Sequence, residues 1–272
     1  MVLGERTLVM GVLNTTPDSF SDGGRLPTDQ AAVAYGLRLF EAGADWVDVG
    51  GESTRPGAAR VGSDEEIRRV VPVVEGMRRR GAGMISVDTT KATVARAALD
   101  AGADLVNDVS AFSFDPAMAP LVAERGTPAV VMHNRGRFED RHRHREYADV
   151  AAEVVDELQE ALGFAQAAGV RREQLIVDPG IGFAKAASHS LEVLGRLEAL
   201  EALDRPVLVG PSRKSFIGEV LDLPVESRLM GTAGAVAASV LLGAHIVRVH
   251  DAAEMVEVVR VCDAIVSAGG AA

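Results

Sequence analysis

Short β-branched runs alternate with longer amphipathic stretches along the whole chain, and this alternation is the feature that most constrains the fold. Eight runs have the character of strands, at residues 7–14, 45–53, 84–89, 104–111, 128–133, 175–180, 206–213 and 245–251. Amphipathic stretches lie between them, for example at residues 65–80, 92–101, 148–168 and 254–267. Apolar strands that alternate with helices predict a parallel sheet covered by helices.

Eight strand–helix units in 272 residues fit a closed (β/α)8 barrel of the TIM type, an α/β fold. The structural alternative is an open, doubly wound sheet. The chain contains no Pro- or Ser-rich linker and no low-complexity run, so we expect a single domain over residues 1–272. A densely charged stretch at residues 134–147 predicts a loop that leads into a long helix.

The overall charge argues against nucleic acid and anionic membranes as partners. Lys and Arg number 28 against 39 Asp and Glu, which gives a net charge of −11. The only cysteine, Cys262, excludes an intrachain disulfide and a multi-cysteine metal site. No uncharged apolar run is long enough to span a membrane, and no signal-peptide pattern opens the chain. We therefore expect a globular cytoplasmic protein.

The carboxyl end of each expected strand carries side chains that can form hydrogen bonds or titrate. A single Asp or Ser in such a place is more often a cap than a functional group. In a TIM barrel, however, all eight ends face one mouth, so their convergence predicts an active site there. The residues are Asn14, Asp48, Glu52, Asp88, Asn107, Asp108, His133, Asp178, Ser212, Lys214, Arg248 and His250.

Three of these residues form a chemically coherent subset. Asp88, Asn107 and Asp178 follow the third, fourth and sixth strands. Two carboxylates and an amide suit a flat heterocycle with an N–H and NH2 edge. General acid–base work, as in glycoside hydrolysis, is the alternative, and spacing alone does not separate the two. Met132 and Phe183 are candidate walls of such a pocket, or ordinary core.

A second subset suits an anion. Lys214 is one of only three lysines, and it follows a Gly-Pro turn as a fixed cation beside Ser215, which opens a short helix. Arg248 and His250 alternate with Val249, so they face the same side of the eighth strand. Asn14 ends the neighbouring first strand, and its carbonyl oxygen together with phosphate oxygens and water can hold Mg²⁺.

With these residues in view, the sequence resembles the dihydropteroate synthase family, the folate-pathway enzymes targeted by sulfonamides. The resemblance spans essentially the whole chain. It is carried, in the family's order, by "MGVLNTTPDSFSDGG", "GGESTRPGA", "SVDTTKA", "NDVSAF", "VDPGIGFAK", "GPSRKSFIG" and "RVHD". It implies a TIM barrel that condenses 6-hydroxymethyl-7,8-dihydropterin pyrophosphate with p-aminobenzoate to 7,8-dihydropteroate and pyrophosphate. Mg²⁺ as cofactor and a homodimer are also implied.

The resemblance also implies a role for each matching residue. Pterin contacts are implied for Asp88, Asn107, Asp178 and Lys214, with Met132 and Phe183 beside them. The pyrophosphate and Mg²⁺ site is implied at Asn14, Arg248 and His250, with Asn14 as the metal ligand. Contacts to p-aminobenzoate are implied for Phe20, Pro56, Lys214 and Ser215, and mobile-loop positions near the reacting centre for Asp22, Thr54 and Arg55. The catalytic candidates are Lys214, Asp88, Asp22, Arg55, Arg248 and His250. An SN1-like mechanism, in which Mg²⁺ assists the departure of pyrophosphate, is implied as well.

Two other functions are weighed against this one. A pterin-dependent methyltransferase barrel shares a pterin pocket, but it has no use for the pyrophosphate cluster or for "SRKSFIG". A non-catalytic pterin-binding paralogue is expected to lose loop residues while it keeps the barrel. The retention of "TPDSFSDGG" and "ESTRPG" argues against that second alternative.

Overall fold

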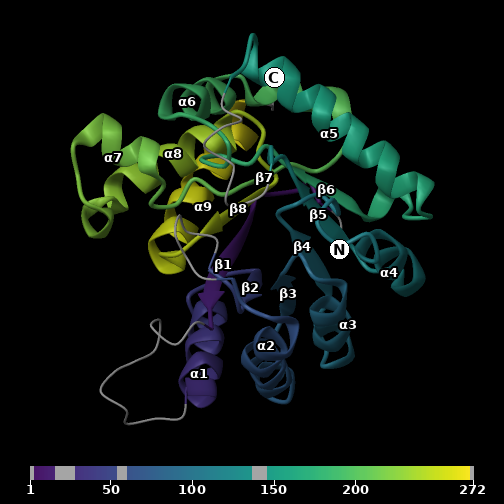
Figure 1. Ribbon diagram of the computed structural model, residues 1–272. Helices are drawn as coiled ribbons and strands as arrows, with labels where there is room; N and C mark the ends of the chain where they lie inside the picture. The colour runs from purple at the N-terminus through teal and green to yellow at the C-terminus, as the bar shows by residue number, and fades with distance from the viewer. Residues whose placement is uncertain (1–2, 16–27, 54–59, 137–145, 270–272) are drawn as a thin grey trace.

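The computed structural model describes residues 3–15, 28–53, 60–136 and 146–269. In these residues eight strands alternate with helices in the order expected from the sequence (Figure 1). The strands are β1 Leu8–Asn14, β2 Trp46–Gly50, β3 Met84–Asp88, β4 Leu105–Asp108, β5 Ala129–Met132, β6 Leu175–Asp178, β7 Leu208–Val209 and β8 Ile246–Val249.

The helices lie outside the strands. The α-helices are α1 Thr28–Glu41, α2 Ser63–Arg78, α3 Ala92–Asp100, α4 Met118–Arg125, α5 Val150–Ala167, α6 Ala187–Gly195, α7 Ser215–Leu221, α8 Leu229–Leu241 and α9 Ala252–Gly269. Short 3-10 turns occur at η2 Arg172–Gln174, η3 Leu197–Leu203 and η4 Val225–Ser227. Local chemistry sets several of these ends. Asp149 caps α5 by accepting a hydrogen bond from the Ala152 amide at 3.0 Å, and Gly43, with φ of +97°, turns the chain from α1 into β2.

The eight strands form a nearly closed parallel barrel. Their order is β6-β5-β4-β3-β2-β1-β8-β7, so neighbours in sequence are bonded from β1 to β6 and from β7 to β8, and β1 is bonded to β8. A parallel bridge between Val177 and Val207 joins the two edges, and the Val177 amide donates to the Pro206 carbonyl at 2.9 Å. The TIM-barrel prediction is confirmed, and the open doubly wound alternative is excluded.

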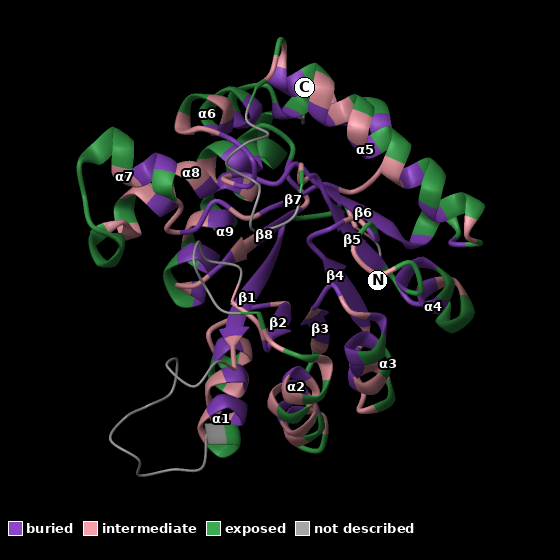
Figure 2. Cartoon of the chain, in the orientation of Figure 1, coloured by how far each residue is buried: buried purple, intermediate pink, exposed green. Residues whose placement is uncertain are grey.

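The core has two layers because alternate residues of a strand face opposite sides of the sheet. Inward-facing side chains fill the barrel and pack as one cluster: Leu8, Met10, Trp46, Leu105, Val130, Ile176, Leu208 and Ile246. Outward-facing residues such as Val9, Val47 and Val49 pack with the helices in a second, larger cluster. Figure 2 shows this as buried strands inside helices whose outer faces are exposed.

The strands are shorter than the apolar runs from which they were predicted, most of all the seventh. The run at 206–213 yields only β7 Leu208–Val209, because Pro206 and Pro211 have no amide hydrogen for the ladder. The shortening leaves polar residues beyond the strand ends, where they line the mouth. None of the described helices is long and apolar enough to cross a membrane.

Candidate active site

The carboxyl ends of the strands enclose a cavity at one end of the barrel. Its lining comes from β3 to β6, from β8 and from the segments that follow β4, β6 and β7. The lining residues are Asp88, Asn107, Val109, Met132, Asp178, Ile181, Phe183, Gly210, Lys214 and Arg248. All six residues expected to contact a pterin, namely Asp88, Asn107, Met132, Asp178, Phe183 and Lys214, are among them. The fold thus brings these six residues from five separate parts of the chain to one place.

Arg248 on β8 joins two carboxylates across the barrel interior. Its Nε donates to Asp48 Oδ2 at 2.6 Å, and its Nη2 donates to Asp88 Oδ2 at 2.8 Å. These partners lie on β2 and β3, neither of which is bonded to β8. Burial acts to lower the pKa of Arg248, but the facing carboxylates of Asp48 and Asp88 raise it above its ordinary value. The guanidinium is therefore a fixed positive charge in the lining of the cavity.

Asp48 is a central residue of the site, and the sequence places it among the polar strand ends without a specific role. Its side chain is fully buried, and Oδ2 accepts from Asn107 Nδ2 at 2.9 Å as well as from Arg248. Oδ1 is buried with no hydrogen-bond partner among the described residues. The available signal was its place between Val47 and Val49, which directs a charged side chain into the barrel.

Burial sets the protonation behaviour of the two acids that line the cavity. It raises the pKa of Asp88 to about 7, although the charge of Arg248 opposes the shift. It also raises the pKa of Asp178 to about 6, against the hydrogen bond that Oδ1 accepts from the Gly180 amide at 2.7 Å. Both carboxyl groups are poised to respond to a ligand that offers hydrogen-bond donors.

Lys214 and Ser215 lie where the seventh strand leads into α7, as the sequence predicted. Lys214 is the residue before the helix, which begins at Ser215. Its Nζ lies 4.2 Å from the ring centroid of Phe183, within the range of a cation–π contact. The adjacent Arg213 makes two bonds to Asp251, at 2.9 and 2.5 Å. Of these two neighbouring cations, Lys214 is the one that lines the cavity.

Asn14 lies beside the cavity at the end of β1. A Cβ built on Gly50 would be 3.4 Å from the Asp88 Cβ and 3.8 Å from Asn14 Oδ1, so both side chains border this glycine. No group of three or more His, Cys, Asp or Glu residues is placed to hold a metal in the part of the chain that is described. One amide oxygen still fits Mg²⁺, which commonly keeps several waters and takes its other ligands from substrate phosphates.

His250 is a neutral donor rather than a second cation. Burial and the charge of Arg248 lower the pKa of its ring to about 4. The His250 amide donates to Ser212 Oγ at 3.2 Å, and the same Oγ lies 3.0 Å from Nδ1. Ser212 Oγ can either donate to Nδ1 or accept from it, and we assign the first arrangement, which places the ring proton on Nε2. Ser212 therefore orients a ring that offers an N–H donor at Nε2.

The expected loop contacts Phe20, Asp22, Thr54, Arg55 and Pro56 lie outside the described residues. The described flanks of residues 54–59 are joined to each other. The Val61 amide donates to Glu52 Oε1 at 2.8 Å, and Lys91 Nζ donates to Glu52 Oε2 at 2.7 Å. Glu52, one of the polar residues expected at the second strand end, thus binds the main chain beside this loop.

Known proteins match this chain over nearly its full length. A family model described as "Pterin binding enzyme" matches residues 10–250. The dihydropteroate synthase of Bacillus subtilis is 45% identical over 266 residues, which cover 98% of this chain and 91% of that protein. A Xanthomonas albilineans dihydropteroate synthase with 4-aminobenzoic acid superposes with a TM-score of 0.91 at 45% identity, covering 96% of this chain and 94% of that one. The same organism's dihydropteroate synthase in complex with 7,8-dihydropteroate gives a TM-score of 0.88 at 42% identity, with 96% and 94% coverage.

Proposed function

The chain belongs to the dihydropteroate synthase family of pterin-binding enzymes, and from this we propose that its barrel mouth joins 6-hydroxymethyl-7,8-dihydropterin pyrophosphate to p-aminobenzoate. The products are 7,8-dihydropteroate and pyrophosphate, so the enzyme is a transferase that alkylates an arylamine. The observation that carries the proposal is that all six expected pterin residues line one and the same cavity. We treat residues 1–272 as one catalytic domain that works in the cytoplasm.

We assign the pterin ring to the cavity floor. The carboxylates of Asp88 and Asp178 accept from N–H and NH2 groups at the ring edge, and the amide of Asn107 can both donate and accept. Asp48 holds the Asn107 amide by accepting from Nδ2, which leaves Oδ1 of Asn107 for the ligand. Met132 and Phe183 supply apolar walls.

The diphosphate group belongs beside Asn14, Arg248 and His250. Arg248 contributes a permanent positive charge, and His250 contributes a neutral N–H donor. Asn14 would hold Mg²⁺ through its amide oxygen, and the bound ion would offset negative charge on the diphosphate. All three groups thus favour the additional negative charge that the diphosphate gains as the bond to carbon breaks.

The bond between the methylene carbon and the diphosphate oxygen breaks first, and pyrophosphate keeps the electron pair. The methylene cation is delocalised into the pterin ring. The amine nitrogen of p-aminobenzoate then uses its lone pair to form the new bond, and one of its two protons passes to water. An arylamine is only weakly basic, so orientation contributes more than general-base assistance. Lys214 and Ser215 border the place of addition, and Phe20, Asp22, Thr54, Arg55 and Pro56 are assigned to the loops around it on the resemblance alone.

A single assay tests the proposal. The protein is mixed with the pterin pyrophosphate, p-aminobenzoate and Mg²⁺, and both pyrophosphate and dihydropteroate are measured. The wild type should form the two products in equal amounts. Asp88→Ala and Lys214→Ala should each lower kcat/KM by about 100-fold or more, because each removes a fixed group at the reacting substrate.

Other outcomes identify the alternatives. Pterin binding without product would indicate a non-catalytic paralogue. Transfer of a methyl group from a pterin methyl donor would indicate a methyltransferase. Near-normal turnover by either alanine variant would remove that residue from the site.

We further propose a homodimer, as the resemblance implies, formed through α8 and α9. Both helices expose large apolar side chains, at Met230, Leu241, Val261, Ile265 and Val266. Exposed apolar area of this kind favours contact with a second copy.

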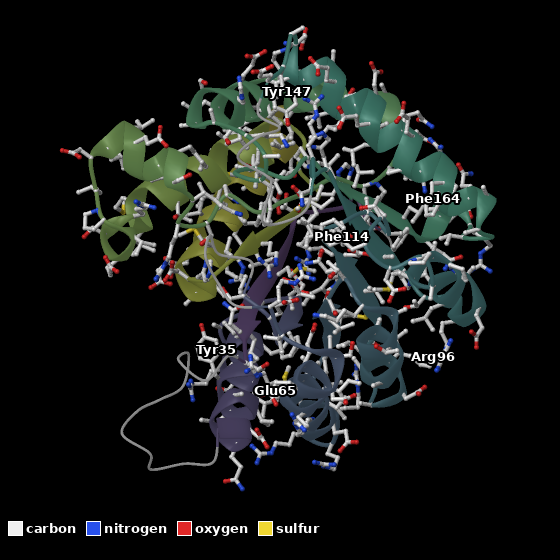
Figure 3. The ribbon with its side chains drawn as sticks, in the orientation of Figure 1. Tyr35, Glu65, Arg96, Phe114, Tyr147 and Phe164 are labelled. Atoms are coloured by element: carbon white, nitrogen blue, oxygen red, sulfur yellow. The ribbon has the colours of Figure 1, made fainter. Side chains whose placement is uncertain are left out.

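Light scattering should give twice the chain mass for the wild type, and the double variant Val261→Lys/Ile265→Lys should give one chain mass. Phe164→Lys on α5, which Figure 3 shows on a different helix, is the control that should stay dimeric.

A further inference from the structure

Lys185 is a buried lysine next to the cavity, and no role above uses it. Its side chain is 3% exposed. Nζ lies 2.7 Å from His133 Nδ1 and 3.3 Å from each of the Gly180 and Phe183 carbonyl oxygens. An ammonium group has three donors, and a carbonyl oxygen can only accept. These three contacts therefore satisfy every donor of a protonated Lys185.

The His133 ring, which accepts a hydrogen bond from Lys185, is neutral. Because Nδ1 accepts from Lys185, the ring proton lies on Nε2, which is 3.0 Å from Glu157 Oε2. Burial and the charge of Lys185 lower the pKa of His133 to about 4. Burial opposes ionisation of Glu157, but hydrogen bonds from His133 and Arg135 lower its pKa to about 2. The result is a continuous chain from the partly exposed Glu157 carboxylate through the buried, neutral His133 ring to Lys185, whose own pKa burial lowers to about 7.

The turn bound by Lys185 has an unusual backbone. Gly180, Gly182 and Ala184 all have positive φ, at 67°, 77° and 46°. Ala184 has a side chain, and a left-handed alanine persists only where its surroundings enforce it. A Cβ on Gly180 would lie 2.0 Å from the His133 carbonyl oxygen, so the turn packs directly on the end of β5.

The other end of the turn is also held by a side chain. Tyr147 OH donates to the Ala184 carbonyl at 3.0 Å, and Figure 3 shows this residue between α5 and α6. The Arg135 guanidinium lies 3.9 Å from the Tyr147 ring centroid and donates to Glu157 at 2.8 Å. Lys185 through His133, and Tyr147 through Arg135, thus connect to the carboxylate of Glu157. Both side chains restrain the turn at residues 180–185.

This turn forms one wall of the cavity. Its Gly180 amide binds Asp178, its Phe183 ring lies under the Lys214 ammonium, and a Cβ on Gly182 would be 3.2 Å from Lys214 Cδ. A shift of the turn therefore moves both the acid and the cation that face the ring.

We propose that Lys185, bound to His133, is a positioning residue for the pterin ring. It fixes the turn at residues 180–185 and does not touch the ligand itself. The inference rests on the assignment of this cavity to the pterin.

Lys185→Met keeps the length and apolar stem of the side chain and removes all three donors. We expect KM for the pterin pyrophosphate to rise about tenfold or more, because small misplacements of binding groups are costly. We expect kcat at saturating substrates to stay within about threefold, since Asn14, Arg248 and His250, which assist bond cleavage, do not belong to this turn. A purely structural loss would instead lower the amount of active enzyme and leave KM unchanged.

Gln174→Met is the matched control at the opposite end of β6. Gln174 is also buried, and its Nε2 donates to the Thr127 carbonyl at 2.7 Å and the Val122 carbonyl at 3.4 Å. Loss of these bonds should lower Tm while KM for the pterin substrate stays at the wild-type value.

His133 gives a second, independent test. The side chain of His133→Asn can place an acceptor where Nδ1 lies, whereas His133→Leu offers none. We expect the Asn variant to keep a KM close to wild type and the Leu variant to resemble Lys185→Met. The double variant Lys185→Met/His133→Leu should lose no more than either single change.

An unchanged KM for the pterin substrate in Lys185→Met would overturn the proposal. If Lys185→Met does not fold, equal KM values for His133→Asn and His133→Leu would overturn it. Failure of the proposed function looks different, because the wild type itself would then form no dihydropteroate.

Discussion

Asp48 shows how a single buried carboxylate can arrange two neighbours that face a substrate. It binds Arg248 and Asn107 at once, at 2.6 and 2.9 Å. In Asp48→Asn the shape remains, but one of the two carboxylates that balance Arg248 is lost and only Asp88 is left. We expect the free energy of unfolding to fall by about 3 kcal/mol, because breaking one of two buried ion pairs leaves the Arg248 charge only partly compensated. Calorimetry or urea unfolding measures this change.

The control for this prediction is an exposed pair of the same kind. Asp100 binds Arg125 at 2.5 Å with its side chain 58% exposed. Asp100→Asn should cost less than about 1 kcal/mol, as exposed pairs generally do. Equal losses in the two variants would show that Asp48 does not depend on burial for its effect.

At this scale the sequence predicts a functional residue well when its place at the end of a strand is enough to identify it. It predicts poorly when the role of the residue depends on a partner far away in the chain. Asp88, Asn107 and Asp178 were identifiable because each follows an apolar strand, and all three line the cavity. Asp48 carried the same local signal, but its partner Arg248 lies 200 residues away. Nothing in the local pattern around Lys185 indicates that it binds His133, 52 residues distant.

At the scale of elements, the turn after β6 requires a glycine at position 180 for two separate reasons, its positive φ and its close approach to another part of the backbone. Gly180 has φ of +67° and faces the His133 carbonyl, whereas Gly126 has φ of +63° with nothing within 4 Å of its Cβ position. Gly126→Ala should cost about 1 kcal/mol, the price of a left-handed alanine. Gly180→Ala must also displace backbone, so we expect a larger loss of stability and a loss of pterin affinity. Thermal unfolding and ligand titration of the two variants measure both effects.

Equal losses of stability in these two variants would contradict the close approach of Gly180 to the His133 carbonyl.

The elements themselves were largely predictable, since apolar periodicity marks strands and helices locally. Their ends were less so. The run at 206–213 contains two prolines that interrupt the ladder, so only Leu208–Val209 pairs as a strand. The charged stretch before α5 was expected as a loop, and its residues 137–145 lie outside the described chain.

At the scale of the whole molecule, closure of the barrel was the step that alternation alone could not decide. Open and closed parallel sheets share the same strand–helix pattern. The distinction rests on the bridge between Val177 of β6 and Val207, the residue that precedes β7. Closure is also what places Asp178 of β6 and Arg248 of β8 around one cavity.

The closed mouth of the barrel contains buried acids, and we expect these acids to lower the stability of the fold. Burial raises the pKa of Asp178 to about 6, above its ordinary value of 3.8. The stability that follows from this shift is present below pH 3.8 and is lost as the pH rises through 6. At pH 8 the folded chain therefore carries a buried carboxylate that the unfolded chain solvates better. Asp178→Asn removes that charge and can still accept from the Gly180 amide.

We therefore expect Asp178→Asn to raise Tm at pH 8, and to raise it less at pH 5, while catalysis is lost. Asp149 is the control of opposite sign. Its pKa is lowered by hydrogen bonds from the Ala152 amide and from Arg196. Its contribution is thus present at neutral pH and is lost in acid, so Asp149→Asn should lower Tm at pH 8. If Asp178→Asn also lowers Tm at pH 8, the hydrogen bonds and cations around this carboxylate stabilise it by more than its burial costs. The Asp178 carboxylate would then not destabilise the fold.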